Sequence, residues 1–368
     1  MRAVIFGAGK MGQATAWAME KLGFELEIID LSQEALDKCN SILEQEAKTH
    51  CIPNLEEYIS KVLLRPWADI VICALPYYHN ITVAKYCIKN GIRYCDLGGN
   101  EEVSEAINDF ASNNGSKPVM TDLGLAPGLI NILTENLYKQ ISKEDGVTPK
   151  VVNMMVGGLP RHASKEDEFN YFCSWSIDGL INEYTENSSI LNNGEITSVK
   201  ALDGYQTVTT QSLGVLEAFY TSGGSSHSLN GLKNLGASHA SYKTLRWPGH
   251  LRIIKLLIEK CELDKATLKN IFKKNCAKHS VEDCVIIYIS IDDKVQEMLV
   301  PPDENFSAMQ RCTGYGVACA ASLIGEGKYD DLFSRSPLRH GDILFEDFNS
   351  KMDILVVEKE EDSSDELQ

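Results

Sequence analysis

The sequence contains no pair of cysteines at C-x-x-C spacing, although it has 11 cysteines in all. That number is odd, and many of the cysteines lie in apolar segments. We therefore expect buried free thiols, and neither disulfides nor a metal site. Long apolar runs are also missing. Because the longest such run has only the length of a strand, the sequence predicts no membrane-spanning helix. The cysteines in apolar segments include Cys73, Cys87, Cys284 and Cys319.

Positive charge is scarce: 35 Lys and Arg stand against 52 Asp and Glu, which gives a net charge of −17. This balance argues against nucleic acid or an anionic membrane as a partner, and an anionic substrate would need a local cationic pocket. No apolar leader precedes the first predicted strand, so we expect no signal peptide and a cytoplasmic protein. The length of 368 residues and the hydrophobic content of 43% are those of a globular chain with room for two domains.

The chain opens with a glycine-rich motif between a predicted strand and a predicted helix. Residues 2–6 form a short apolar run, residues 7–12 have the spacing G-x-G-x-x-G, and residues 13–22 show helical periodicity. In this context the glycines permit a tight turn, close approach of a pyrophosphate, and close packing of helix on strand. The helix N-terminus would offer N–H groups to the phosphates. The motif predicts dinucleotide binding by Gly7, Gly9, Lys10, Met11 and Gly12; a glycine-rich turn without a ligand is the alternative.

A carboxylate follows the second predicted strand, residues 25–29. Asp30 lies eighteen residues beyond Gly12, where a carboxylate accepts hydrogen bonds from the ribose hydroxyls of an adenosine and repels a 2′-phosphate. The next residues, Leu31 and Ser32, supply no arginine to bind such a phosphate. The sequence therefore favours NAD over NADP as the cofactor.

Strands and helices alternate up to about residue 126, which indicates a Rossmann-like, doubly wound parallel sheet. Ligands of such sheets bind outside the carboxyl ends of the strands. We expect the turns after the later strands to surround the nicotinamide and the substrate. At these turns the sequence places Ala74, Leu75, Pro76 and Leu97 as cofactor contacts, and Tyr77 and Asp96 as substrate contacts. The predicted strands cover 68–75, 92–96 and 118–122, and the predicted helices 80–90 and 103–113.

The sequence pattern changes after residue 126, and the new pattern predicts a second α/β domain. Residues 127–305 mix β-branched strands with short helices, which suggests an open, mixed or largely antiparallel sheet for substrate binding or dimer formation. Residues 307–324 are rich in small residues, which suggests a helix that packs closely against another element. Residues 306–345 should form this helix and a loop that return to the first domain. We expect a terminal strand and an acidic tail within residues 346–368.

The polar residues that could carry chemistry lie in both predicted domains. Asp96 and Asp122 end two parallel strands, although each could simply cap its turn. Arg246 can bind a carboxylate through its bidentate guanidinium, and His250 titrates near neutral pH at the start of a helix. Strand alternation places Lys243 on the face opposite Arg246. A surface strand with solvated cations is the alternative interpretation of this segment.

A series of short motifs follows one another along the chain. They are Asp96-Leu-Gly-Gly99, Asp122-Leu-Gly-Leu-Ala-Pro-Gly128 with Asn131-Ile-Leu133, Gly157-Gly-Leu-Pro160, Trp175-Ser176 with Glu183-Tyr184, Leu216-Glu-Ala-Phe219 with Thr221-Ser-Gly-Gly224, and Tyr242-Lys-Thr-Leu-Arg246 with Pro248-Gly-His250. These motifs resemble the saccharopine dehydrogenase family, and within it most closely the lysine 6-dehydrogenase branch. The resemblance extends from residue 1 to about residue 325. It implies a Rossmann domain, a second α/β domain that mediates homodimer or higher oligomer formation, and NAD(P)-dependent oxidation of an amine on an amino acid.

One departure from the family bears on the substrate. The resemblance implies an arginine for the glutamyl group of saccharopine near residues 219–224, and this sequence has none there. We therefore expect L-lysine, oxidised at its ε-carbon to allysine, which cyclises to piperideine carboxylate. Arg246 is the candidate for the α-carboxylate and Asp122 or Asp96 for the α-ammonium. The general base is left open among His250, a neutral Lys243 and Asp122. Saccharopine, a carboxyalkyl polyamine, and NAD binding without turnover are the alternatives.

Overall fold

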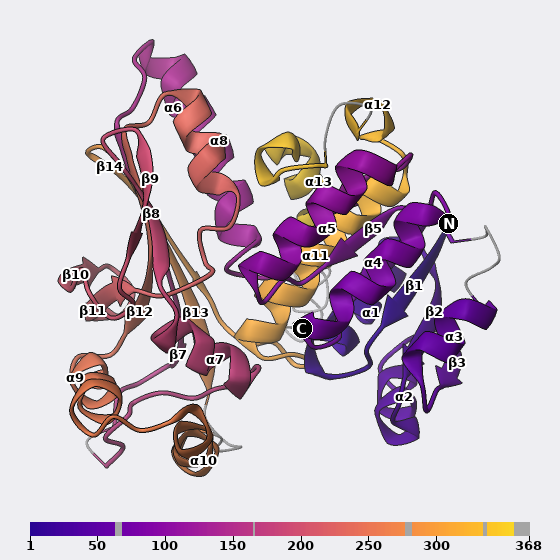
Figure 1. Ribbon diagram of the computed structural model, residues 1–368, viewed down its shortest axis with the longest axis horizontal. Helices are drawn as coiled ribbons and strands as arrows, with labels where there is room; N and C mark the ends of the chain where they lie inside the picture. Colours follow the sequence, from indigo (N-terminus) through magenta and orange to yellow (C-terminus); the bar gives the residue numbers. More distant parts are fainter. Residues whose placement is uncertain (63–67, 165, 277–281, 334–336, 357–368) are drawn as a thin grey trace, which may run out of the picture. The chain divides into compact units, whose positions relative to one another are not determined.

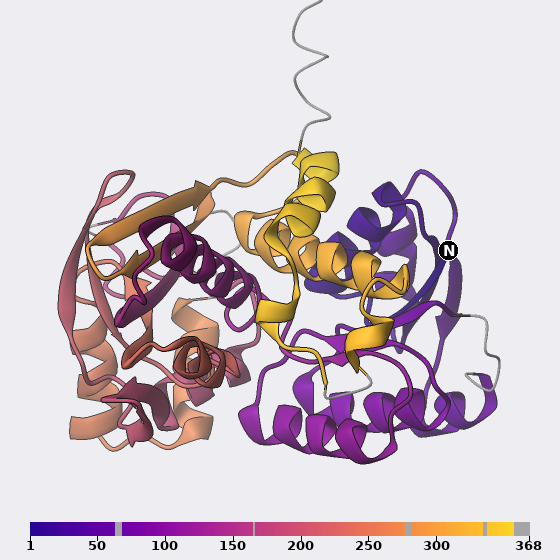
Figure 2. The same cartoon turned by 90° about the horizontal axis from the view of Figure 1, so that it is seen from above.

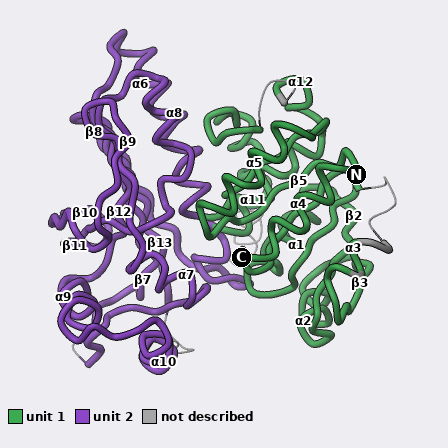
Figure 3. The backbone as a smooth tube through the Cα atoms, viewed as in Figure 1, with its two compact units in different colours: residues 1–124, 313–368 green, residues 125–312 purple. Residues whose placement is uncertain are grey.

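The computed structural model describes residues 1–62, 68–164, 166–276, 282–333 and 337–356. The chain divides into two compact units (Figure 3). Unit 1 contains residues 1–124 and the described residues from 313 onward, and unit 2 contains residues 125–312. Within the described residues, no helix combines the length and the apolar character needed to cross a bilayer.

Unit 1 is built on a six-stranded parallel sheet with the strand order β3-β2-β1-β4-β5-β6 (Figure 1). The parallel, doubly wound sheet predicted from the sequence is confirmed. Its strands are β1 (Arg2–Phe6), β2 (Glu25–Asp30), β3 (Lys48–Cys51), β4 (Ile70–Cys73), β5 (Tyr94–Asp96) and β6 (Val119–Met120). Its first helices are α1 (Lys10–Lys21), α2 (Gln33–Asn40), α3 (Leu55–Val62), η1 (Tyr77–His79), α4 (Asn80–Lys89) and α5 (Glu101–Asn114).

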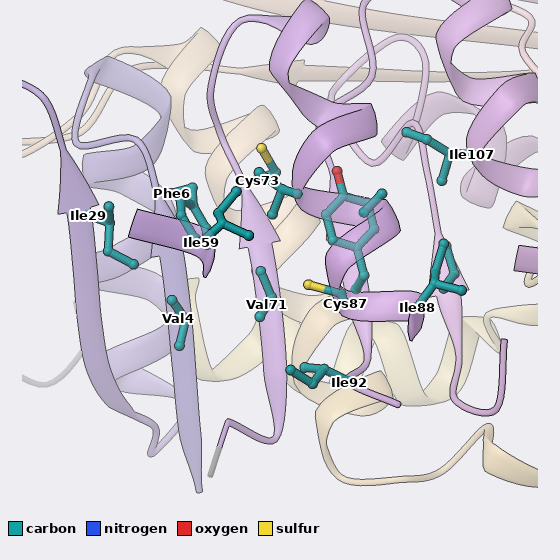
Figure 4. Packing of buried hydrophobic residues seen from close by; sticks show 14 of the residues in the cluster. Val4, Phe6, Ile29, Ile59, Val71, Cys73, Cys87, Ile88, Ile92 and Ile107 are labelled. Carbon is teal, nitrogen blue, oxygen red and sulfur yellow. The ribbon is translucent and has the colours of Figure 1, made fainter. Parts of the chain in front are cut away.

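Side chains from alternate strand positions cover the two faces of this sheet. On one face, Val4, Phe6, Val71 and Cys73 pack against α3, α4 and α5 in a single apolar cluster (Figure 4). The central strands β1 and β4 are buried on both faces, which is why they are apolar and β-branched. Cys73, Cys87, Cys284 and Cys319 are buried free thiols, as expected.

Helix α11 (Ala308–Gly325) is continuous across the point where the chain passes from unit 2 to unit 1. In unit 1 it packs closely on α1: a Cβ at Gly314 would lie 2.5 Å from that of Ala14, and Tyr315 stacks on Trp17. The small residues that predicted a closely packed helix here therefore face the helix that follows the glycine motif. Figure 2 shows α11 in orange beside the terminal segments in yellow. These are α12 (Asp330–Phe333), η3 (His340–Asp342) and α13 (Phe345–Val356).

Unit 2 contains an eight-stranded mixed sheet, in which β10-β11-β12-β7-β13-β14 form the main order and β8 pairs with β12 and β9. Among the described strand pairs of this sheet, only β12–β7 is parallel, so the predicted mixed sheet is confirmed. The strands are β7 (Val151–Pro160), β8 (Ser188–Asn192), β9 (Glu195–Val199), β10 (Gln206–Thr210), β11 (Gly214–Tyr220), β12 (His239–Arg246), β13 (Asp283–Ile291) and β14 (Lys294–Val300). The helices are α6 (Leu129–Asp145), α7 (Ile177–Thr185), α8 (Ser228–Leu235), α9 (His250–Lys255), η2 (Leu256–Lys260) and α10 (Lys265–Asn275).

The two faces of this sheet differ in what covers them. Phe219 of β11 packs into a cluster formed with α7, α9 and α10. On the opposite face, Leu216, Leu245 and Ile286 belong to a cluster whose described members come from strands and loops. Glu297 of β14 accepts hydrogen bonds from the turn between β10 and β11. This contact connects β14, at one edge of the sheet, to the β10–β11 hairpin at the other edge.

Three local predictions need correction. The predicted terminal strand is wrong, because residues 345–356 form helix α13; the predicted acidic tail, residues 358–368, lies outside the described residues. The strand predicted at 118–122 is only Val119–Met120, since Asp122 has a positive φ of 64° that ends the extended chain. The helix predicted to start near His250 is α-helical only to Lys255 and continues as the wider turn η2.

Candidate functional site

The glycine motif forms the turn between β1 and α1, with the geometry that a dinucleotide needs. Gly7 has φ +104°, and a Cβ there would lie 2.7 Å from the carbonyl oxygen of Ala74. A Cβ at Gly12 would overlap the carbonyl oxygen of Gly7, whereas one at Gly9 would have nothing within 4 Å. Gly7 and Gly12 are thus required by the fold, and Gly9 leaves open space above the turn.

The N-terminus of α1 faces this open space. Gly9 is its N-cap residue and has no side chain to bond the N–H groups of the first turn. Lys10 is exposed and Met11 half-buried at the same end. A helix of 12 residues with such an N-terminus attracts a phosphate through its N–H groups and its dipole. The turn therefore fits a pyrophosphate.

Asp30 at the end of β2 is held in place by backbone N–H groups. Oδ2 accepts from Ala8, in the glycine turn, at 2.7 Å, and Oδ1 accepts from Ser32 at 2.8 Å. Each oxygen keeps a second lone pair for a ribose hydroxyl. The carboxylate is therefore fixed beside the turn that fits the pyrophosphate, as a nucleotide site requires.

The turns after β4 and β5 lie at the same edge of the parallel sheet. Ala74, Leu75 and Leu97 are half-buried, and Pro76 is exposed at the start of η1. Tyr77 packs on the second of two glycines with positive φ: a Cβ at Gly99 would lie 3.1 Å from the Cβ of Tyr77. These residues border the edge where the predicted nicotinamide end would lie.

Asp96 and Asp122 meet behind this edge. Asp96 is fully buried, and its Oδ1 accepts the N–H groups of Gly98 at 2.8 Å and of Asp122 at 3.2 Å. Its Oδ2 accepts from the Tyr94 hydroxyl at 3.0 Å. Burial and the neighbouring Asp122 raise the pKa of Asp96 to about 7. The Asp96 carboxylate therefore holds the turns that follow β5 and β6. The carboxylate of Asp122 has a partner of its own, because Ser104 Oγ donates to its Oδ1 at 2.6 Å.

Unit 2 contains a buried polar cluster around Arg246 at the end of β12. The guanidinium donates from Nε to the Tyr184 hydroxyl at 3.1 Å, and from Nη1 to Thr244 Oγ1 and to the Leu245 carbonyl oxygen. It also lies over the ring of Tyr171, 4.4 Å from the centroid. Burial would lower the pKa of Arg246, but Tyr184, Tyr171 and Glu183 raise it, so the guanidinium stays charged.

Glu183 is a charged member of this cluster that was not predicted from the sequence. Its Oε2 lies 3.8 Å from Arg246 Nη2, and 18% of its side-chain surface is exposed. Burial raises the pKa of Glu183 to about 7, against the opposing effect of Arg246. Its position on α7 follows from the Ser176 cap and the apolar spacing of that helix. A carboxylate beside the apolar face of a predicted helix was the available signal.

His250 and Lys243 stand in different surroundings. His250 is buried, with Nε2 3.0 Å from the Tyr184 hydroxyl and Nδ1 2.7 Å from the Phe169 carbonyl oxygen. Burial, with the charge of Arg246, lowers its pKa to about 3, so the ring is neutral. Lys243 points to the other face of β12, where Nζ donates to Gln206 Oε1 at 2.6 Å and lies over the Tyr220 ring.

The structure thus brings some predicted residues together and separates others. Arg246 and His250 share one cluster, and Asp96 and Asp122 share another in unit 1. Lys243 lies away from Arg246 on the opposite face of the sheet. Its pKa is lowered by burial. Among the described residues, no group of three or more His, Cys, Asp or Glu side chains could hold a metal ion.

Comparison with known families accounts for both units. The model of the saccharopine dehydrogenase NADP binding domain matches residues 3–121, and that of the saccharopine dehydrogenase C-terminal domain matches residues 124–334. The chain belongs to the saccharopine dehydrogenase family. Membership of this family identifies it as an oxidoreductase with an NAD(P)-binding domain.

Two solved structures of similar fold cover nearly all of this family member. The apo saccharopine dehydrogenase (L-Glu forming) of Saccharomyces cerevisiae is 14% identical with a TM-score of 0.71, over 96% of both chains. A homospermidine synthase of Legionella pneumophila, solved in complex with NAD, is 14% identical with a TM-score of 0.68, over 96% of this chain and 88% of that one. At this identity the two share the fold with the present chain.

Proposed function

We propose that this chain is an NAD-dependent amino-acid dehydrogenase that oxidises the ε-amine carbon of L-lysine. In this proposal residues 1–126 bind the cofactor and residues 127–305 bind the substrate. The observation that carries the substrate assignment is the pairing of Arg246 with Glu183. The guanidinium is already engaged by protein groups, whereas Glu183 is partly exposed. Such a site fits an ammonium group better than an additional carboxylate.

Lysine agrees with this charge pattern better than saccharopine does. Lysine carries two amines and one carboxylate, whereas saccharopine carries additional carboxylate groups that each need a cationic partner. The segment 219–224 offers no arginine for them. A carboxyalkyl polyamine is the second candidate, because a carboxylate that fits one ammonium group also fits a polyamine.

The NAD preference rests on Asp30. Its carboxylate is fixed by Ala8 and Ser32 where the ribose 2′-hydroxyl of NAD would lie, and it would repel the 2′-phosphate of NADP. The chemistry that NAD supplies when bound is an acceptor for the hydride that leaves the substrate carbon. The protein holds the dinucleotide through the glycine turn, the N-terminus of α1 and Asp30.

The protein must also remove a proton from the reacting amine, since only a neutral nitrogen donates electrons as the hydride leaves. Among the three predicted bases, we favour Asp122. Both ring nitrogens of His250 have partners in the protein and Lys243 is bonded to Gln206, whereas Asp122 follows β6 at the edge of the parallel sheet that carries the cofactor motif. Water then hydrolyses the imine to the semialdehyde and ammonium. In this scheme Arg246 positions Glu183 and Tyr184; direct binding of the α-carboxylate by Arg246 stays a prediction.

The test is an assay of the purified chain with L-lysine and NAD, in which reduced cofactor and free ammonium are measured together. We expect the two to form in equal amounts, with slower turnover when NADP replaces NAD. Turnover of saccharopine with release of glutamate, and none with lysine, would contradict the lysine assignment. Binding of NADH without turnover of lysine, saccharopine or a carboxyalkyl polyamine would indicate a binding protein.

A matched pair of variants tests the role of Glu183. Glu183→Gln should raise the KM for lysine at least about tenfold, because the charge that binds the ammonium is lost. The dissociation constant of NADH should stay unchanged. Glu186→Gln alters a more exposed carboxylate at the end of the same helix, paired with Lys265, and should leave both values unchanged. An unaltered KM in Glu183→Gln would exclude this role.

A further inference from the structure

A short C-terminal segment of unit 1 returns to the end of β6. The Leu338 N–H donates to the Val119 carbonyl oxygen at 3.1 Å, which adds a partner at the edge strand of the parallel sheet. Two residues later, η3 begins at His340. The His340 side chain is 1% exposed, so this segment is part of the interior of unit 1.

His340 makes a bond to Asp122, which lies 218 positions earlier in the chain. Its Nε2 is 2.8 Å from the Asp122 carbonyl oxygen. A carbonyl oxygen only accepts, so Nε2 must carry the hydrogen of this bond. Burial lowers the pKa of His340, against the raising effect of the Asp122 carbonyl and carboxylate. The residue is therefore present as the neutral Nε2–H tautomer near neutral pH.

Asp122 has a conformation that needs such support. Its φ of 64° is in the left-handed region, which non-glycine residues adopt at a cost of roughly 1 kcal/mol or more. The N–H, the carboxylate and the carbonyl oxygen of Asp122 are each bonded to a different element of unit 1. Asp96 accepts its N–H, Ser104 of α5 donates to its carboxylate, and His340 donates to its carbonyl oxygen. The direction of the Asp122 side chain therefore depends on all three.

We propose that His340 is a positioning residue, which fixes the backbone of Asp122 so that its carboxylate is held in the orientation used by the enzyme. The catalytic consequence rests on the function proposed above for Asp122; the structural consequence does not. The N–H of His340 supplies what neither β5 nor α5 can supply, since both engage other atoms of Asp122. The C-terminal segment thereby becomes part of the site that the first strands form.

Three variants separate positioning from stability. His340→Leu removes the donor with little change in size, and His340→Gln keeps a side-chain N–H that can donate to the carbonyl. Leu338→Ala shortens a buried side chain of the same segment and leaves the imidazole in place. Each is compared with the full-length wild type in thermal unfolding, in NADH affinity, and in kcat and KM for lysine.

We expect His340→Leu to lower kcat by about tenfold to a hundredfold, because a small displacement of a reacting group has effects of this size. The dissociation constant of NADH should change less than twofold. His340→Gln should recover most of the lost kcat. Leu338→Ala should lower the melting temperature and retain kcat. Equal loss of kcat in Leu338→Ala and His340→Leu, or a wild-type kcat in His340→Leu, would overturn the proposal.

A second readout does not depend on turnover. Hydrogen exchange of the Asp122 and Leu123 amides, both bonded to Asp96, should be faster in His340→Leu than in wild type and near wild type in His340→Gln. Unchanged exchange in His340→Leu overturns the positioning role whatever the substrate is. If exchange changes while wild type fails to oxidise lysine, the proposed substrate is wrong and the positioning role stands.

Discussion

Asp30 is the residue whose surroundings make the sharpest prediction about the cofactor. Both oxygens accept a backbone N–H, so an amide in its place would direct an NH2 group at one of these donors. We predict that Asp30→Asn weakens NADH binding at least about fivefold, because a charge-assisted bond to the ribose is lost. Binding of NADPH should weaken less, since repulsion of its phosphate is removed. Fluorescence titration with both reduced cofactors measures the two affinities.

Asp37→Asn is the control for this measurement. Asp37 lies on α2 in the same unit, and its carboxylate accepts a hydrogen bond from the side chain of Gln33 at the surface. The substitution removes the same charge from the same unit without altering the turn. An unchanged ratio of NADH to NADPH affinity in Asp30→Asn would contradict the role assigned to Asp30.

Asp96 predicts how stability depends on pH. Its pKa of about 7 in the folded protein lies above the ordinary value of 3.8, so the folded state holds more protons than the unfolded state between these values. The stability that protonated Asp96 contributes below pH 4 should therefore decrease as the pH rises to 7, by on the order of 3 kcal/mol. Asp96→Asn keeps an acceptor for Gly98 and should show a smaller decrease. Denaturant unfolding of wild type and Asp96→Asn at pH 4.5 and 7.5 measures this decrease. An equal decrease in the two proteins would exclude Asp96 as its source.

Single residues were predictable where the backbone conformation or the charge of the site allows only one residue type. Gly7, Gly12 and Asp30 occupy the positions that the motif assigns, because backbone clearance and charge leave few alternatives. Glu183 was missed because a helical glutamate is usually a solvated charge, and only the fold shows that Arg246 lies beside it. The burial of His250, with both nitrogens engaged, likewise depends on Phe169 and Tyr184, which the sequence separates widely.

The turn between β1 and α1 makes a prediction at the level of an element. Gly9→Ala adds a methyl group that meets no protein atom within 4 Å, whereas the same change at Gly12 overlaps a backbone oxygen. Gly9→Ala should keep the melting temperature and weaken NADH binding at least about tenfold, because the methyl group occupies the space for the phosphates. Gly12→Ala should lower the melting temperature by several degrees, as strain of a few kcal/mol does. Calorimetry and NADH titration distinguish the two variants. Equal unfolding temperatures for Gly9→Ala and Gly12→Ala would contradict the prediction.

Elements were predictable where apolar periodicity was strong. The buried strands β1, β2 and β4 are recognisable by their β-branched runs. The edge strand β3 is K-T-H-C and lacks such a run, so neither it nor α3 was predicted. Residues 354–356 form a short apolar run typical of a strand, whereas in the structure they end helix α13, whose Phe348 and Leu355 are buried.

The whole molecule should assemble into a homodimer or a larger homo-oligomer, as the family resemblance implies. Each copy carries a net charge of −17, so association brings like charges together. We predict that the species of twice 40.8 kDa or more becomes more stable as salt rises from about 0.02 M to 0.3 M, because screening weakens the repulsion. Sedimentation equilibrium measures the dissociation constant. A monomer at all salt concentrations, or dissociation by salt, would contradict this prediction.

For the whole molecule, the sequence predicted the fold class but not the contacts by which the C-terminal segment returns to unit 1. Alternating strands and helices were enough to predict the parallel sheet, and the later strands were enough to predict a mixed sheet. The return of residues 313–356 to unit 1 was expected in outline from the small residues of α11. The bond from His340 to Asp122 could not be predicted, because nothing local in either segment refers to the other.

Unit 1 is assembled from both ends of the chain, with all of unit 2 between them. During synthesis, the ribosome delivers the six parallel strands long before α11 and His340 emerge. The nascent polypeptide must therefore keep the surfaces of α1 and of Ile70 in β4, which α11 later covers, exposed while an entire second unit is translated. A message truncated after residue 312 would yield a polypeptide with one complete unit and one that chaperones and proteases would recognise as unfinished.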